Sequence, residues 1–123
     1  MFAAIVVLAV CVLGLGYHFS KRIVRQLPPT ELAKITGQAD ISNYGWIELF
    51  AYNGSEFILT EVLVSVSVFD EKGSPIISNR VYRLPAYYFY PQSSRKLSTD
   101  LGFRLEAGQS WKFWIVGAKG RPE

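Results

Sequence analysis

The feature that most constrains this chain is the stretch from Phe2 to Phe19, FAAIVVLAVCVLGLGYHF, which has no residue that is charged at neutral pH. At a rise of about 1.5 Å per residue, a helix of this length would span about 27 Å, close to the thickness of a bilayer's hydrocarbon core. No basic residue precedes the run, and it is longer than the apolar core of a signal peptide. Residues 1–26 are therefore predicted to form an uncleaved, single-pass transmembrane anchor. The side chains expected to make up its apolar surface are Phe2, Ile5, Val6, Leu8, Val12, Leu13, Leu15 and Tyr17.

Charge is concentrated at one end of this anchor. Lys21, Arg22 and Arg25 follow the apolar run directly, at the level expected for lipid headgroups. Because basic residues beside a membrane helix favour the cytoplasmic side, we expect a bacterial inner-membrane protein whose domain faces the cytoplasm, with the periplasm as the alternative. From residue 26 onward there are ten Lys and Arg against ten Asp and Glu. This neutral domain lacks the electrostatic signature of a nucleic-acid-binding protein.

The segment after the anchor, residues 27–43, is predicted to be a linker with a short helix. Pro28 and Pro29 disfavour continuation of the anchor helix. Thr30 is a suitable N-cap for a helix from Glu31 to Thr36, and Gly37 a suitable stop.

From Tyr44 onward the sequence follows the period of β-strands. Residues 46–52, WIELFAY, form a predicted strand, and valine recurs at every second position from Val62 to Val68, which favours a central, inward-facing strand. The polar stretch of residues 70–75 predicts a turn into a returning strand over residues 76–84. A short strand or loop over residues 94–108 and a last strand over 110–118 complete the pattern.

Asn53-Gly54-Ser55 lies between two predicted strands. Asn and Gly both tolerate a positive φ, so the tripeptide predicts a turn. It also matches an N-glycosylation sequon, but turn chemistry is the preferred interpretation.

Aromatic residues mark the candidate interface. Four of them stand in a row between Pro85 and Pro91, which leaves no alternation of polarity. Two prolines make this segment a poor central strand, so part of it is expected to face outward, with capping of the sandwich core as the alternative. The last strand is apolar on both faces, which implies contact with the core and with a further surface. The candidate interface residues are Tyr87, Tyr88, Phe89, Tyr90, Trp111 and Trp114.

Together these patterns predict a mainly β fold: a single transmembrane helix followed, over residues 44–123, by a small immunoglobulin-like antiparallel β-sandwich of five to seven strands. The run from Asn53-Gly54-Ser55 through the alternating valines to Phe69-Asp70-x-x-Gly73 resembles the bacterial FxLYD-type sandwich domains. That resemblance covers residues 48–120. It implies a membrane-anchored, non-catalytic domain that is usually extracytoplasmic.

Residues that carry chemistry are scarce. The one histidine, His18, and the one cysteine, Cys11, both lie in the predicted anchor. The domain therefore has neither a histidine nor a thiol for catalysis or metal binding, and no glycine-rich phosphate loop. We expect no catalytic residue, no metal site and no cofactor, and hence a protein that is not an enzyme.

The sequence favours a non-catalytic accessory subunit of a bacterial integral membrane complex, with respiratory and photosynthetic assemblies as natural hosts. Its expected partners are integral membrane subunits and the bilayer. The alternative is a free-standing anchored module that binds a peptide, a glycan or a lipid headgroup. A pocket lined by tyrosines 87, 88 and 90 with Trp114 would favour the module, whereas a flat apolar face would favour the subunit.

Overall fold

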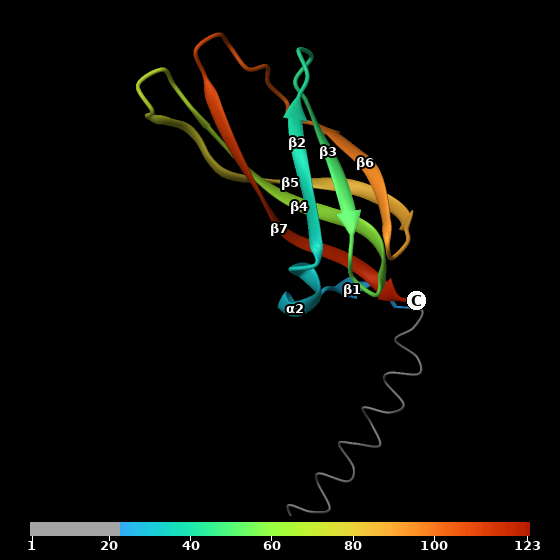
Figure 1. Cartoon of the computed structure of the whole chain (residues 1–123). Coiled ribbons are helices and arrows are strands. Elements are labelled where there is room, and N and C mark those ends of the chain that lie inside the picture. The colour runs from blue at the N-terminus through green and yellow to red at the C-terminus, as the bar shows by residue number, and fades with distance from the viewer. Residues whose placement is uncertain (1–22) are drawn as a thin grey trace, which may run out of the picture.

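The computed structural model of the chain describes residues 23–123, which form a mainly β fold with two antiparallel sheets (Figure 1). The predicted transmembrane helix, with Lys21 and Arg22, lies outside the described residues. One sheet has the strand order β1-β7-β4-β5, and the other has the order β2-β3-β6. The elements are β1 (Arg25–Gln26), α2 (Pro29–Leu32), β2 (Ile35–Ile41), β3 (Trp46–Asn53), β4 (Phe57–Phe69), β5 (Pro75–Phe89), β6 (Ser93–Asp100) and β7 (Ser110–Pro122).

Strand β4 is the centre of the larger sheet, as its valine alternation predicts. It pairs with β5 on one side and with β7 on the other. Val62, Val64, Val66 and Val68 are fully buried, and they face a core that includes Ile47 from β3. β-Branched side chains fit this position because their restricted χ1 costs little in a strand and they pack closely on a pleated surface.

The turn after β3 is built around the side chain of Asn53, which is fully buried. Its amide nitrogen donates to the carbonyl oxygens of Phe57 (2.8 Å) and Phe89 (3.0 Å). Its amide oxygen accepts from the backbone N–H (3.0 Å) and the hydroxyl (2.6 Å) of Ser55. The predicted turn is present, but it does not use the expected positive φ, because neither Asn53 nor Gly54 has one. In this fold the sequon asparagine is enclosed by protein.

The structure corrects the predicted linker over residues 27–43. Leu27 is buried, and its N–H donates to the carbonyl oxygen of Ala118 at 2.9 Å. Helix α2 spans four residues, and β2 then pairs with β3 along its whole length. The small residue Gly37 permits this pairing, because a Cβ there would lie 2.7 Å from the carbonyl oxygen of Phe50. The sandwich therefore begins at residue 25, before the predicted start at residue 44.

The remaining strands match or extend the predictions. The hairpin through residues 70–74 is present, and residues 93–100 form strand β6. Strand β5 continues to Phe89 at the edge of its sheet, where Pro75 and Pro85 are tolerated because a free edge needs no ladder donor. Strand β1 and the end of β7 lie at the same end of the sandwich (Figure 1).

Candidate interaction surfaces

The six predicted interface residues do not share one environment. Phe89 is fully buried in the core, so its assignment to an interface is wrong: its side chain faces inward beside Leu59 of β4. Trp111 is partly buried and packs against the core. Tyr87, Tyr88 and Tyr90 are 73%, 61% and 49% exposed, and Trp114 is 50% exposed.

The exposed tyrosines result from an irregularity in the pairing of β4 with β5. Phe89 pairs with Leu59 and Pro85 pairs with Glu61, so three residues of β5 lie opposite one residue of β4. We call residues 86–88 of β5 the tyrosine bulge. Tyr87 and Tyr88 have φ angles of 39° and 57°, a left-handed conformation that non-glycine residues adopt only at a cost. This geometry leaves both rings in solvent.

Arg95 of β6 holds the tyrosine bulge in place. Its guanidinium donates to the carbonyl oxygens of Ala86 and Tyr87, and to that of Tyr88 at 3.1 Å. The same group lies over the ring of Phe89, 5.3 Å from its centroid. Arg95 therefore joins the smaller sheet to the edge strand of the larger one. The sequence contains no local signal for this contact, because the partners become neighbours only when the two sheets pack.

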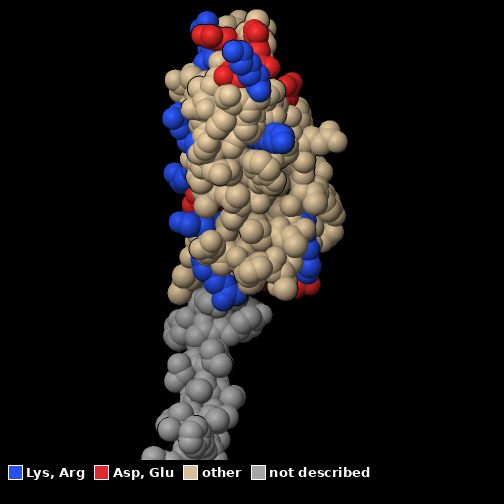
Figure 2. All heavy atoms as spheres, turned by 90° about the vertical axis from the view of Figure 1, so that its left-hand side faces the viewer, with Lys and Arg blue, Asp and Glu red and all other residues tan. Residues whose placement is uncertain are grey.

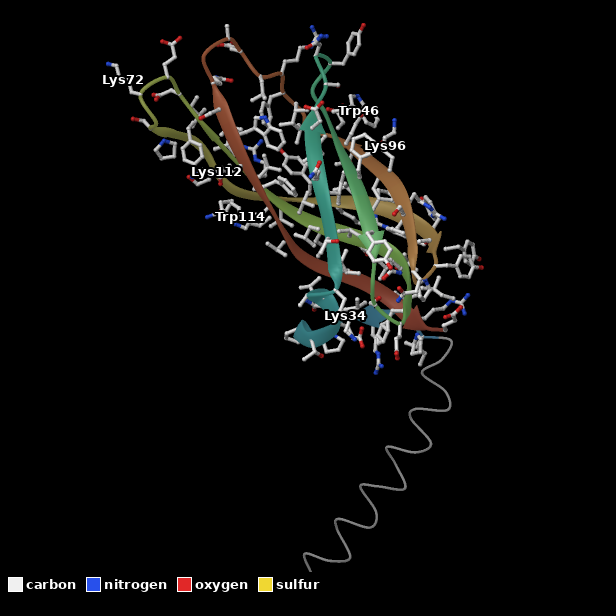
Figure 3. The ribbon with its side chains drawn as sticks, viewed as in Figure 1. Lys34, Trp46, Lys72, Lys96, Lys112 and Trp114 are labelled. Carbon is white, nitrogen blue, oxygen red and sulfur yellow. The ribbon has the colours of Figure 1, made fainter. Side chains whose placement is uncertain are left out.

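A second exposed surface lies on the outer side of the larger sheet. Ser65 of β4 is paired on one side with Val81 and on the other with Trp114. Val81, Trp114 and the nearby Val116 are 57%, 50% and 44% exposed, and we call these three residues the outer patch. Because the side chain of Ser65 is small, it does not separate the larger side chains of Val81 and Trp114 on the two neighbouring strands. Figure 3 shows Trp114 pointing away from the sandwich.

Charged side chains lie near the outer patch on the same side of the larger sheet. Lys112 lies one position along the same face of β7, with its ammonium 5.7 Å from the ring centroid of Phe69. Glu61 is largely buried and accepts from Arg83 (2.8 Å), with Lys119 at 3.8 Å. Figure 2 shows a mostly uncharged side of the molecule, with Lys and Arg along one edge and charged groups of both signs at the upper end. An apolar centre with charged side chains at its rim is typical of a protein interface.

A third exposed group lies on the outer side of β3 and was missed by the sequence analysis. Trp46, Phe50 and Tyr52 alternate with core residues and are all exposed. Their i, i+4, i+6 spacing was the available signal, because alternate residues of a strand share one face. A hollow of about 310 Å³ is lined by Phe50, Ala51, Tyr52, Ser94, Arg95 and Lys96. Trp46 and Trp114 lie on opposite sides of the molecule (Figure 3).

The tyrosine bulge and the outer patch are separate surfaces. The bulge lies opposite Thr60 of β4, whereas Trp114 lies opposite Ser65. Five residues along a strand correspond to roughly 17 Å. The structure therefore does not bring tyrosines 87, 88 and 90 together with Trp114 in one pocket. The side chains of the outer patch come from β5 and β7, on either side of β4.

Comparisons with protein-family models, with curated proteins and with solved structures found no match for this chain. Within residues 23–123, no helix has the length and apolarity needed to cross a bilayer. The same part of the chain contains no group of three or more His, Cys, Asp or Glu placed to hold a metal ion.

Proposed function

We propose that this protein is a non-catalytic accessory subunit of a bacterial integral membrane complex. Residues 2–19 anchor it in the inner membrane, with the cytoplasm favoured for the domain by the basic residues after the anchor. The observation that carries the proposal is the outer patch, whose large apolar side chains are exposed on the outer side of the larger sheet. Three strands packed against a larger sheet, with connections crossing between them, support an immunoglobulin-like class for the sandwich.

The shape of the exposed apolar surface favours a subunit over a ligand-binding module. In the outer patch, Val81 of β5 and Trp114 of β7 lie at paired positions on either side of Ser65 of β4, and Val116 lies nearby at the register shift of β7. Such a surface suits a protein partner, because protein interfaces bury broad areas with aromatic residues near their centre. Small ligands instead need concave sites that enclose most of their surface.

The start of the sandwich supports docking close to the membrane. Arg25 of β1 is paired with Gly120 of β7, so the domain follows the predicted anchor almost directly. The few residues between Phe19 and Arg25 reach at most about 20 Å when extended. The surfaces of the sandwich are therefore held within the reach of neighbouring membrane subunits.

A second candidate function rests on the hollow beside Phe50 and Tyr52. Two aromatic rings next to Ser94 and Lys96 could hold the planar or sugar-like part of a small ligand. Lys96 is the more available cation there, because its contact with Glu48 is long, at 4.0 Å, whereas Arg95 donates to the carbonyls of the tyrosine bulge. A free-standing anchored binding module for a glycan, peptide or lipid headgroup would use this site.

The experiment that tests the proposal is affinity purification of the full-length chain from membranes of its native host in a mild detergent. The wild type is compared with Val81→Ser/Trp114→Ser, and with Trp46→Ser as a matched control on the opposite side. We expect a stoichiometric set of membrane proteins that the double variant loses and the control keeps. Elution of the wild type alone would contradict the proposal. Loss of the set in the Trp46→Ser variant alone would contradict docking through the outer patch and place it on the outer side of β3.

A further inference from the structure

Strand β7 has one edge that is largely uncovered. On one side it pairs with β4 from Ser110 to Pro122. On the other side β1 covers the last part alone, through the pairs Arg25–Gly120 and Gln26–Lys119 and the hydrogen bond from Leu27 to Ala118. Within the described residues 23–123, no strand lies beside residues 110–117 on that side. We call this segment the free edge of β7.

The sequence explains why β1 stops where it does. Continuing β1 along the free edge would place Pro28 and Pro29 opposite the next residues of β7. Proline has no N–H to donate and a fixed φ, so it cannot extend the ladder. The chain turns instead into α2, which begins at Pro29.

The free edge presents the backbone groups of three inward-facing residues. In one strand, residues whose side chains point to the same face direct their N–H and C=O to the same edge. Ala118 is buried, and its carbonyl accepts a hydrogen bond from the N–H of Leu27. The backbone N–H and C=O groups of inward-facing residues of β7 therefore point toward the β1 side. Trp111, Phe113 and Ile115 also point inward and pack against the core. Their N–H and C=O groups therefore point toward the uncovered side.

The side chains of the free edge are incompletely covered as well. Trp111, Phe113 and Ile115 remain partly exposed, whereas the valines that they approach on β4 are fully buried. The reason is that both sheets end on this flank. In the other sheet the flanking strand is β2, whose inward residues Ala39 and Ile41 are likewise partly buried. An added strand would shield these apolar side chains from water.

The free edge also lacks the protection that the other flank of the sandwich has. Edge strands usually avoid unwanted pairing by means of proline, charge or repeated bulges. Strand β5 has Pro75, Pro85, two arginines and several register shifts. Strand β6 has Arg95 and Lys96 side by side. Residues 110–117 contain no proline, one charged residue (Lys112) and one register shift, at Val116.

We propose that the free edge of β7 binds an extended segment of a partner subunit, which adds as an antiparallel strand in continuation of β1. The segment has apolar residues at alternate positions, to cover Trp111, Phe113 and Ile115, and backbone groups that complete the ladder. This inference rests on the proposed function and names how the partner docks. The outer patch lies beside the same strand, so one partner can cover both.

A second copy of this chain fits the free edge less well. Antiparallel pairing of β7 with the β7 of another copy requires a two-fold axis perpendicular to the sheet. That axis reverses the strand direction, so the N-terminal ends of the two copies would point in opposite directions. Two anchors in one bilayer need the same direction.

The test is amide hydrogen exchange of the full-length chain in detergent micelles, with and without a synthetic probe. The probe is a nine-residue peptide of alternating valine and threonine with blocked ends. At a probe concentration about ten times its Kd, we expect exchange at Trp111, Phe113 and Ile115 to slow about tenfold. Amides of Lys112 and Trp114 point toward β4 and should not change, which provides an internal control.

Two variants sharpen the test. Phe113→Lys places a charge pointing inward at the edge and should abolish the protection, whereas Ile76→Lys, at an exposed position of β5, should retain it. Unchanged exchange at the three amides of the wild type, or exchange that is already slow without probe, would overturn the inference. Concentration-dependent protection at these amides without probe would replace it by self-association. If the probe fails while the outer-patch variant still loses its partners, the proposed function stands and this inference falls.

Discussion

The guanidinium carbon of Arg95 lies 5.3 Å from the centroid of the Phe89 ring, although these two residues belong to different sheets. Its N–H groups are directed at three consecutive carbonyls of the tyrosine bulge. One side chain thus packs on a core aromatic ring and stabilises a strained backbone. This links the exposure of Tyr87 and Tyr88 to the packing of the two sheets.

Removal of the Arg95 side chain should loosen the tyrosine bulge. We expect Arg95→Ala to lower the free energy of unfolding by about 2 kcal/mol, because charge-assisted hydrogen bonds and a cation–π contact are lost together. Chymotrypsin should also cleave after Tyr87 or Tyr88 faster than in the wild type. Urea unfolding and timed proteolysis of the full-length chain measure both effects. Lys96→Ala, on the next residue, is the control and should change stability by less than about 0.5 kcal/mol.

Tyr88→Gly should make the fold more stable. The φ of Tyr88 is 57°, which glycine adopts without the steric cost that a Cβ imposes. We expect a gain of about 0.5–1 kcal/mol after the greater chain entropy of glycine is subtracted. Tyr90→Gly, at a residue without a positive φ, should give no gain. A loss of stability in Tyr88→Gly would mean that the ring packs on the fold in solution.

Asn53→Ala should be strongly destabilising, by about 3 kcal/mol. The substitution leaves the carbonyls of Phe57 and Phe89 and the polar groups of Ser55 without their buried partner, and each unsatisfied group costs about 1–3 kcal/mol. Denaturant unfolding monitored by circular dichroism measures the effect. Asn43→Ala, at an exposed position, is the matched control. Equal stability of the two variants would show that the buried network contributes little.

A pair of valine substitutions separates stability from docking. Val66→Ala creates a cavity between the sheets and should cost about 2 kcal/mol in unfolding free energy. Val81→Ala removes the same atoms from an exposed position of the outer patch and should change stability by less than about 0.5 kcal/mol. The proposed function predicts weaker partner retention for Val81→Ala in the affinity purification. Full retention in that variant would argue against a central role of Val81.

The sequence predicts the parts of the fold that depend on local pattern. The valines of β4, the hairpin after it and the Asn53 turn each carry a signal within a few residues. Strand β2 does not, because its inward positions include Gly37 and Ala39, whose burial arises from close approach to β3. Without large apolar residues at those positions, the alternation is too weak to separate a strand from a linker.

The candidate surfaces follow the same rule. The exposure of Trp114 agrees with the two apolar faces of the last strand, because one face of any strand points away from the core. The burial of Phe89 between two exposed tyrosines could not be predicted from four aromatic residues in a row. It depends on where the bulge interrupts β5, which in turn depends on Arg95 of β6. Arg95 comes close to the tyrosine bulge only when the two sheets pack together.

The short pairing of β1 also has a mechanical consequence. A load applied at the N-terminal end of the domain passes first through two residue pairs and the hydrogen bond from Leu27 to Ala118, whereas β4 is paired along both of its sides. Strand β1 should therefore separate from β7 before β4 separates from its neighbours. When β1 peels away, the uncovered part of β7 lengthens toward Gly120. Tension between the membrane and a docked partner would thus enlarge the edge to which that partner holds.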